Sequence, residues 1–159
     1  MNRNEELLKN IELSYITIKK DTLFNLNVDM NKVVVDCKNM PLNKGSNELW
    51  AHTFTLDNWY LLLNPMETFN QEDSSPIVVK NNGKKNFLFF TSLKYLQEFC
   101  KQHQLFNNKD EVYAIKFYPH KDISWLNVIK NYADVYNIIT LFLIMVILVI
   151  LSKLKNFKN

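Results

Sequence analysis

Residues 76–90 read PIVVKNNGKKNFLFF, and this stretch predicts a β-hairpin. Two runs rich in β-branched and aromatic residues, 76–80 and 86–90, flank five polar residues. Asn82-Gly83 supplies the positive φ angles that a tight turn between two strands requires. The chain is therefore expected to contain an antiparallel sheet.

Further strands are predicted on both sides of the hairpin. Short β-branched or alternating runs are typical of strands, and they occur at residues 32–37, 49–54, 59–63 and 111–117. The pattern at residues 14–18 fits a helix and a strand equally well. Polar loops are expected at residues 39–47, 57–58 and 70–75, where glycine, proline, asparagine and aspartate accumulate.

Three helices are predicted from capping residues followed by apolar residues at helical spacing. Asn4 can cap the first, which continues through Leu7, Leu8 and Ile11. Thr91-Ser92 can cap a second over residues 93–103, and Asp122 a third that reaches Tyr132. Strands mixed with about three helices predict an α+β domain with a mainly antiparallel sheet.

An uncharged run lies near the end of the chain. Residues 135–152 contain no charged side chain, residues 138–151 are apolar except for Thr140, and three lysines follow, at positions 153, 155 and 158. Eighteen helical residues span about 27 Å, close to the hydrocarbon thickness of about 30 Å. We therefore predict a soluble domain at 1–134, a single transmembrane helix at 135–153 and a basic tail at 154–159.

An alternative interpretation of the run stays open. Strictly apolar runs of this length also occur as buried helices or strands inside soluble proteins. The membrane is favoured because the run has no polar face, whereas a helix on a domain surface carries a single apolar stripe. The tyrosines before the run, Tyr132 and Tyr136, and the lysines after it suit the two membrane interfaces.

The composition indicates in which compartment the domain is expected and which class of partner is not expected. The three lysines after the run account for the formal net charge of +3, so the preceding domain is neutral. A neutral domain lacks the basic surface that nucleic acid requires, and no nucleic-acid partner is expected. Cys37 and Cys100 are isolated cysteines typical of a reducing compartment. The polar N-terminus lacks the apolar core of a signal peptide, so the domain is expected on the cytoplasmic side.

No residue pattern indicates catalysis, a cofactor or a metal. With only Gly45 and Gly83, the chain contains no P-loop, GxGxxG or GxSxG motif. His52, His103 and His120 are widely spaced, and no HExxH motif occurs. We predict that the protein is not an enzyme and has no catalytic, cofactor-binding or metal-binding residues.

Several chemically reactive or large side chains are candidates for a site. Cys100 and His103 are three residues apart and would share one face of a helix, so they could form a thiolate pair. The favoured interpretation is that Cys100 is instead a buried side chain of the core. His52 alternates with Trp50 and Phe54 in the predicted strand 49–54. The three tryptophans, Trp50, Trp59 and Trp125, are expected in the core. Lys84 and Lys85 are expected on an exposed turn.

The chain from residue 49 to about residue 126 resembles the SseB-type (enhanced serine sensitivity) N-terminal domain. The similarity rests on WYLLL at 59–63, PIVV at 76–79, the Asn82-Gly83 turn, LFFTS at 88–92 and ISWL at 123–126. The resemblance implies a small α+β module and supplies no active-site residues. Where that domain would continue into a final strand, this chain enters the apolar run instead.

These observations predict a small interaction domain held at the lipid bilayer by one C-terminal helix, with another protein as its partner. The alternative is a wholly soluble SseB-like binding or immunity-like protein whose apolar run is buried core. An unrecognised enzyme would instead require a polar pocket near Trp50, His52 or His103.

Overall fold

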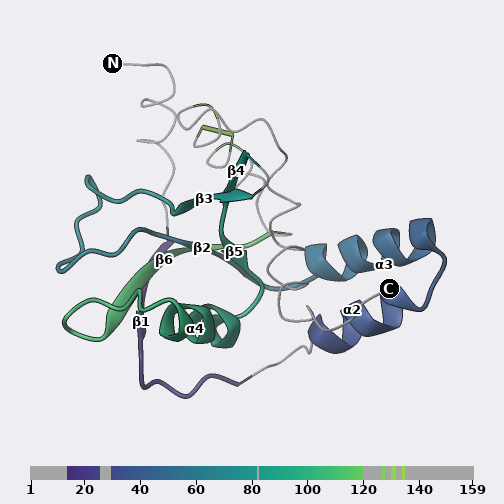
Figure 1. Ribbon diagram of the computed structural model, residues 1–159, viewed down its shortest axis with the longest axis horizontal. Coiled ribbons are helices and arrows are strands. Elements are labelled where there is room, and N and C mark those ends of the chain that lie inside the picture. Colours follow the sequence, from purple (N-terminus) through teal and green to yellow (C-terminus); the bar gives the residue numbers. More distant parts are fainter. Residues whose placement is uncertain are drawn as a thin grey trace.

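The computed structural model describes residues 14–25, 30–81 and 83–119, together with Asn127, Lys130, Asn131 and Asp134. Strands and helices alternate irregularly along this part of the chain, which confirms an α+β fold with an antiparallel sheet (Figure 1). The elements, in chain order, are β1 (Ser14–Lys19), α2 (Met30–Lys38), α3 (Leu42–Phe54), β2 (Trp59–Leu62), β3 (Val78–Asn81), β4 (Lys84–Phe87), β5 (Phe89–Phe90), α4 (Leu93–Gln102) and β6 (Glu111–Phe117).

Four strands form the main sheet in the order β1-β6-β2-β5, and every neighbouring pair is antiparallel. The central strand β6 pairs with β1 along six residues and with β2 along four. The predicted strands at 59–63 and 111–117 are therefore confirmed. The ambiguous segment at 14–18 is a strand, because it pairs with residues 112–116 of β6.

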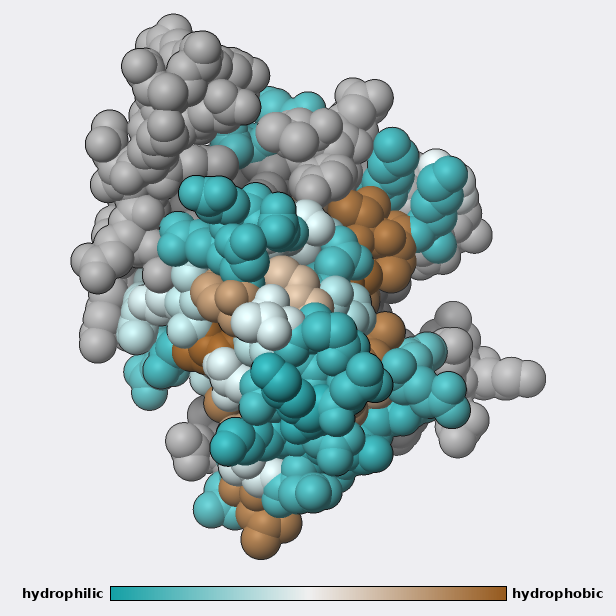
Figure 2. Space-filling model, turned by 90° about the vertical axis from the view of Figure 1, so that its left-hand side faces the viewer, coloured by the Kyte–Doolittle hydropathy of each residue, from teal (hydrophilic) through white to brown (hydrophobic). Residues whose placement is uncertain are grey.

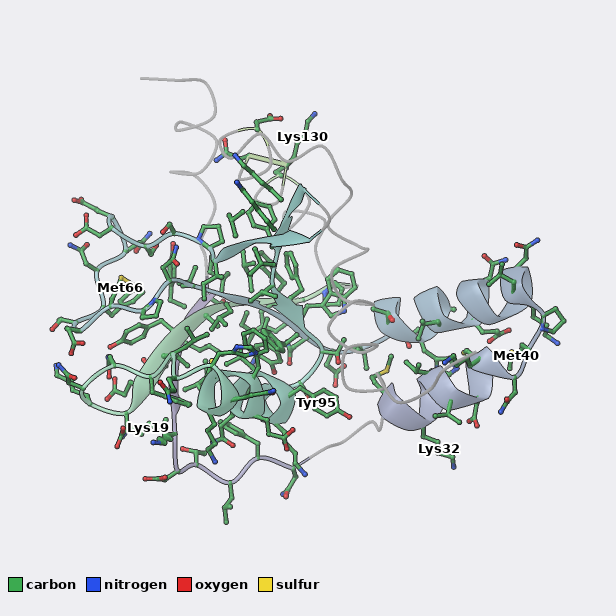
Figure 3. The ribbon with its side chains drawn as sticks, viewed as in Figure 1. Lys19, Lys32, Met40, Met66, Tyr95 and Lys130 are labelled. Atoms are coloured by element: carbon green, nitrogen blue, oxygen red, sulfur yellow. The ribbon has the colours of Figure 1, made fainter. Side chains whose placement is uncertain are left out.

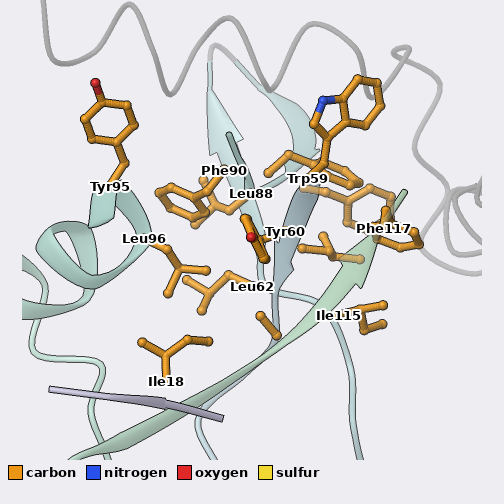
Figure 4. Close-up of a cluster of buried hydrophobic side chains, with 14 of the residues drawn as sticks. Ile18, Trp59, Tyr60, Leu62, Leu88, Phe90, Tyr95, Leu96, Ile115 and Phe117 are labelled. Atoms are coloured by element: carbon orange, nitrogen blue, oxygen red, sulfur yellow. The ribbon is translucent and has the colours of Figure 1, made fainter. Parts of the chain in front are cut away.

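Both faces of this sheet are buried, as Figure 4 shows. Ile18, Leu62 and Phe90 lie on the face that α4 covers, together with Leu96 from α4 itself. Trp59, Leu61, Phe89 and Ile115 have exposed fractions of 0% on the opposite face. Burying one such side chain stabilises a fold by about 1.5–3 kcal/mol, so these two layers dominate the stability of the domain.

Helix α4 begins where its sequence predicts. Ser92 is the N-cap, and its hydroxyl oxygen accepts a hydrogen bond from the backbone N–H of Tyr95 at 3.1 Å. This bond satisfies one of the N–H groups that the first turn leaves without an intrahelical partner. Leu96 and Cys100 then fall one turn apart on the buried face, both with exposed fractions of 0%.

The predicted hairpin turn is confirmed, but the predicted strand at 86–90 is divided between β4, which ends at Phe87, and β5 of the main sheet. β3 and β4 pair in the register Val78↔Phe87 to Asn81↔Lys84, and Gly83 in the connecting turn has φ of +77°. Figure 1 shows the hairpin on the side of the main sheet opposite α4. The Phe87 and Phe89 rings meet edge to face with centroids 6.5 Å apart, which joins the hairpin to the core.

Two predicted strands are wrong, since residues 32–37 and 49–54 lie in helices α2 and α3. Met30, Val34 and Cys37 recur at helical spacing on the buried side of α2. The two helices lie side by side (Figure 1), and Gly45 of α3 packs against the backbone carbonyl of Cys37. The predicted loop at 39–47 is therefore shortened to residues 39–41, because α3 begins at Leu42.

Two predicted elements lie outside the described residues: the helix that begins near Asn4 and the transmembrane helix at 135–153. Of the predicted helix capped by Asp122, the structure describes only Asn127, Lys130 and Asn131, which are helical. Within the part of the chain that the structure describes, no helix combines the length and the apolar character needed to cross a bilayer.

Candidate functional site

The proposed pair of Cys100 and His103 does not form a reactive dyad. The Cys100 thiol is fully buried, and burial raises its pKa to about 12. A thiol acts as a nucleophile through its thiolate, so Cys100 is inert at neutral pH. The His103 side chain is exposed at the end of α4 and lies against the Phe99 ring, with centroids 4.3 Å apart.

Cys37 is a second buried cysteine with the same character. Burial raises its pKa, and the nearby carboxylates of Glu48 and Asp36 raise it further. Both described cysteines are free thiols, as the sequence spacing predicts. They act as small apolar side chains of the core.

The remaining candidate residues are scattered. His52 is exposed on helix α3 and does not lie in a strand as predicted. Trp59 is part of the core, where its indole N–H donates to the backbone carbonyl of Thr53 at 2.9 Å. Lys85 is exposed just after the hairpin turn. The side chains of Trp50 and Lys84, and the whole of His120 and Trp125, lie outside what the structure describes.

One cavity brings together segments that are far apart in the sequence. It has a volume of about 210 Å³ and lies where the β1–α2 connection, the α3–β2 turn and the start of α4 meet. Its lining residues are Phe24, Asn25, Leu56, Asp57, Asn58, Tyr60, Thr91, Ser92 and Leu93. A cavity of this size accommodates a small polar molecule and not an extended chain.

The polar groups around the cavity are arranged for hydrogen bonding. Burial raises the pKa of Tyr60, and the electrostatic effects of Tyr118 and Asp57 raise it further, so its phenol stays neutral at neutral pH. The Asn58 amide donates to the carbonyl of Phe117 at 3.4 Å, which holds it at the sheet edge. The Thr91 hydroxyl oxygen is buried and has no hydrogen-bond partner among the described residues.

The lining of this cavity carries several kinds of polar group. It contains hydroxyl, amide and carboxylate groups, but no histidine, lysine or cysteine of the described residues that could act as a base or nucleophile. Nor do the described residues contain a cluster of three or more histidine, cysteine, aspartate or glutamate side chains suited to a metal.

A second, wider hollow of about 390 Å³ lies at the C-terminal end of β1, between residues 19–22 and 109–111. Beneath it, the Gln97 amide nitrogen donates to the carbonyls of Lys19, Lys20 and Thr22 at 3.0, 3.1 and 2.6 Å. These contacts hold the residues that follow β1 against α4. The hollow is an open surface that carries both lysines and carboxylates. It therefore favours neither an anionic nor a cationic ligand.

No sequence pattern indicates the cavity, because its residues come from four separate turns and strand ends. Gln97, in contrast, carries a recognisable signal. It lies on the buried side of α4 with Leu96 and Cys100, where a polar side chain must find partners inside the protein.

Exposed apolar side chains are few and separate in the described residues. Leu23, Leu42 and Phe69 have exposed fractions of 95%, 87% and 36%. Phe69 packs between Tyr15 and Tyr113, with centroids 5.1 and 5.3 Å away. Figure 2 shows a face that is mostly hydrophilic with small apolar patches, so it presents no broad apolar docking surface among the residues that are coloured there.

Comparison with family models, with curated proteins and with solved structures found no match to this chain.

Proposed function

We propose that the protein is a small binding domain held at a membrane by a single helix formed by residues 135–153. The observation that carries this proposal is the uncharged run at residues 135–152. A peptide backbone in hydrocarbon must satisfy its own hydrogen bonds, and a helix does so within one segment.

The energetics of insertion support the anchor. Apolar residues near the centre of a membrane helix each contribute about −0.3 to −0.6 kcal/mol. The thirteen apolar residues of 138–151 therefore favour insertion by about 4–8 kcal/mol, with no charged residue to oppose them. Asp134 is the last charged residue before the run, so the domain would stand directly at the bilayer surface.

The described part of the domain supports binding over catalysis. Its reactive candidates are separated, since Cys100 is buried, His52 is exposed on α3 and His103 is exposed at the C-cap of α4. The cavity beside Tyr60 presents hydrogen-bonding groups around a small volume. The domain would bind another protein at the membrane, and the cavity would hold a polar side chain or small molecule.

Membrane extraction of the full-length protein tests the anchor. The protein should stay in the membrane pellet after washing with high salt and then alkaline carbonate. The variant Ile144→Lys/Val146→Lys should be extracted, because two central lysines add about 5–7 kcal/mol, which cancels the favourable insertion energy. The matched variant Ile144→Leu/Val146→Leu should stay in the pellet.

Recovery of the wild-type protein in the soluble fraction would refute the anchor. Truncation after residue 135 distinguishes the two interpretations of the run further. A folded, soluble fragment supports a membrane helix, whereas aggregation of the fragment supports an apolar run that is buried in the domain.

The orientation of the anchor is part of the proposal. We place the domain in the cytoplasm and residues 154–159 on the far side of the bilayer. The lysines at 153, 155 and 158 oppose this orientation through the positive-inside tendency. Protease protection in sealed vesicles decides it: digestion of the domain only after lysis would place it on the lumenal side.

A further inference from the structure

The β3–β4 hairpin brings two positive charges together. Lys80 and Lys85 are direct partners in its register, so their side chains leave the same face of the two-stranded sheet. Both are exposed. Directly opposite side chains in an antiparallel pair lie about 4.5–5.5 Å apart at Cβ, and like charges at such positions repel.

The hairpin and its flanking residues contain no acidic side chain of their own. No aspartate or glutamate occurs from residue 74 to residue 97, whereas Lys80, Lys84 and Lys85 all lie within this stretch. The surface formed by Lys80 and Lys85, called the hairpin lysine pair below, therefore favours an anion between its two ammonium groups.

The position of the pair in the molecule indicates which anion. Figure 3 places the β3–β4 hairpin and Lys130 at the same end of the molecule, with Lys19 at the opposite end. Lys130 is exposed there and lies five residues before the uncharged run, which begins at residue 135. If that run enters the bilayer, the hairpin end of the domain is the end next to the lipid headgroups.

We infer that the hairpin lysine pair binds the anionic headgroups of the bilayer in which the protein is anchored. This inference rests on the proposed membrane function and adds the lipid class that the domain contacts. A lysine at an anionic membrane surface gains about fivefold in binding, so the pair should gain about 25-fold. The long aliphatic stems let both ammonium groups reach the headgroup layer.

Hydrogen exchange on the full-length protein in lipid nanodiscs tests the inference. We expect the backbone amides of residues 77–88 to exchange about 25-fold more slowly in phosphatidylcholine–phosphatidylserine discs than in pure phosphatidylcholine discs. The double variant Lys80→Gln/Lys85→Gln should lose this difference. The matched variant Lys19→Gln/Lys20→Gln removes the same charge at the opposite end and should retain it.

Salt dependence of the wild-type protein gives a second measurement that needs no variant. Raising the ionic strength toward about 1 M shortens the screening length to about 3 Å, and the difference between the two lipids should then disappear. Equal exchange in the two disc types, or an equal loss in both double variants, would overturn the inference while leaving the anchor intact. Failure of the chain to enter nanodiscs at all would refute the anchor, and the inference with it.

Discussion

The Gln97 amide offers the sharpest test of how the domain is held together. Its side chain is 6% exposed and donates to three backbone carbonyls, those of Lys19, Lys20 and Thr22. Methionine has a similar size but no donor, so Gln97→Met removes these bonds without opening a cavity. Two N–H groups at about 1 kcal/mol each predict a loss of about 2 kcal/mol in the free energy of unfolding.

The loss should stay near this value because the three carbonyls belong to exposed residues, where water can replace the amide. A loss of about 2 kcal/mol lowers the melting temperature of a domain of this size by about 6–8 °C. Thermal unfolding of the full-length protein followed by circular dichroism measures this shift. Gln102→Met on the same helix is the matched control, since Gln102 is exposed, and should change stability by less than about 0.5 kcal/mol.

A carboxylate at the same position extends the test. In Gln97→Glu the ionised side chain has no N–H to donate and faces three carbonyl oxygens, so folding should favour its protonated form and raise its pKa. The variant should then lose stability as pH rises through the titration of the introduced carboxyl group. Our reasoning would be refuted if Gln97→Met and Gln102→Met unfolded at the same temperature, or if Gln97→Glu were as stable as the wild type at neutral pH.

Three further predictions follow from packing and burial. Gly45→Ala should lower the free energy of unfolding in urea by about 1–3 kcal/mol, because the new Cβ overlaps the carbonyl oxygen of Cys37. The control Asn47→Ala, at an exposed position of α3, should not lower it. Trp59→Phe should cost about 1–3 kcal/mol by removing the indole donor to Thr53 and leaving a void, as measured by chemical denaturation; an unchanged midpoint would contradict it. Burial raises the pKa of Cys100 to about 12, so thiol reagents at a pH of about 8 should modify it only after unfolding. The thiol of the unfolded chain ionises near a pH of about 8.5, so Cys100 should lower the free energy of unfolding as pH rises from there toward 12. The prediction would be contradicted if, over this range, the free energy of unfolding of the wild type rose relative to that of Cys100→Ala.

The parts of the fold that were predictable depend on local rules. The Asn82-Gly83 turn needs a positive φ angle, which Gly83 has at +77°. Ser92 caps α4 through a hydrogen bond to Tyr95, only three residues further along the chain. In each case the residues that decide the structure are neighbours in the sequence.

The cavity was not predictable for the opposite reason. Tyr60 lies on the face of the sheet that α4 covers, and Thr91 stands at the entry to that helix. Asp57 and Phe24 reach the same place from two other connections. Their proximity follows from the strand order β1-β6-β2-β5. No pattern of neighbouring residues in the sequence reveals this order.

Helices α2 and α3 were mistaken for strands because the windows that suggested strands were too short. Six residues span less than two helical turns, over which periods of about 2.0 and 3.6 give similar patterns. The full helices contain the missing information: Met30, Val34 and Cys37 in α2, and Gly45, Leu49 and Thr53 in α3, recur every three or four residues on the buried side.

Packing between these helices also explains why the valines of α2 do not form a strand. β-branched residues lower helix propensity by only a few tenths of a kcal/mol each, because their χ1 freedom is reduced. Burying Met30 and Val34 contributes about 1.5–3 kcal/mol each. The close approach at Gly45, where a hydrogen replaces a side chain opposite the Cys37 carbonyl, lets α3 lie near enough to cover them. Burial therefore outweighs propensity, and the helical pairing depends on the single glycine of α3.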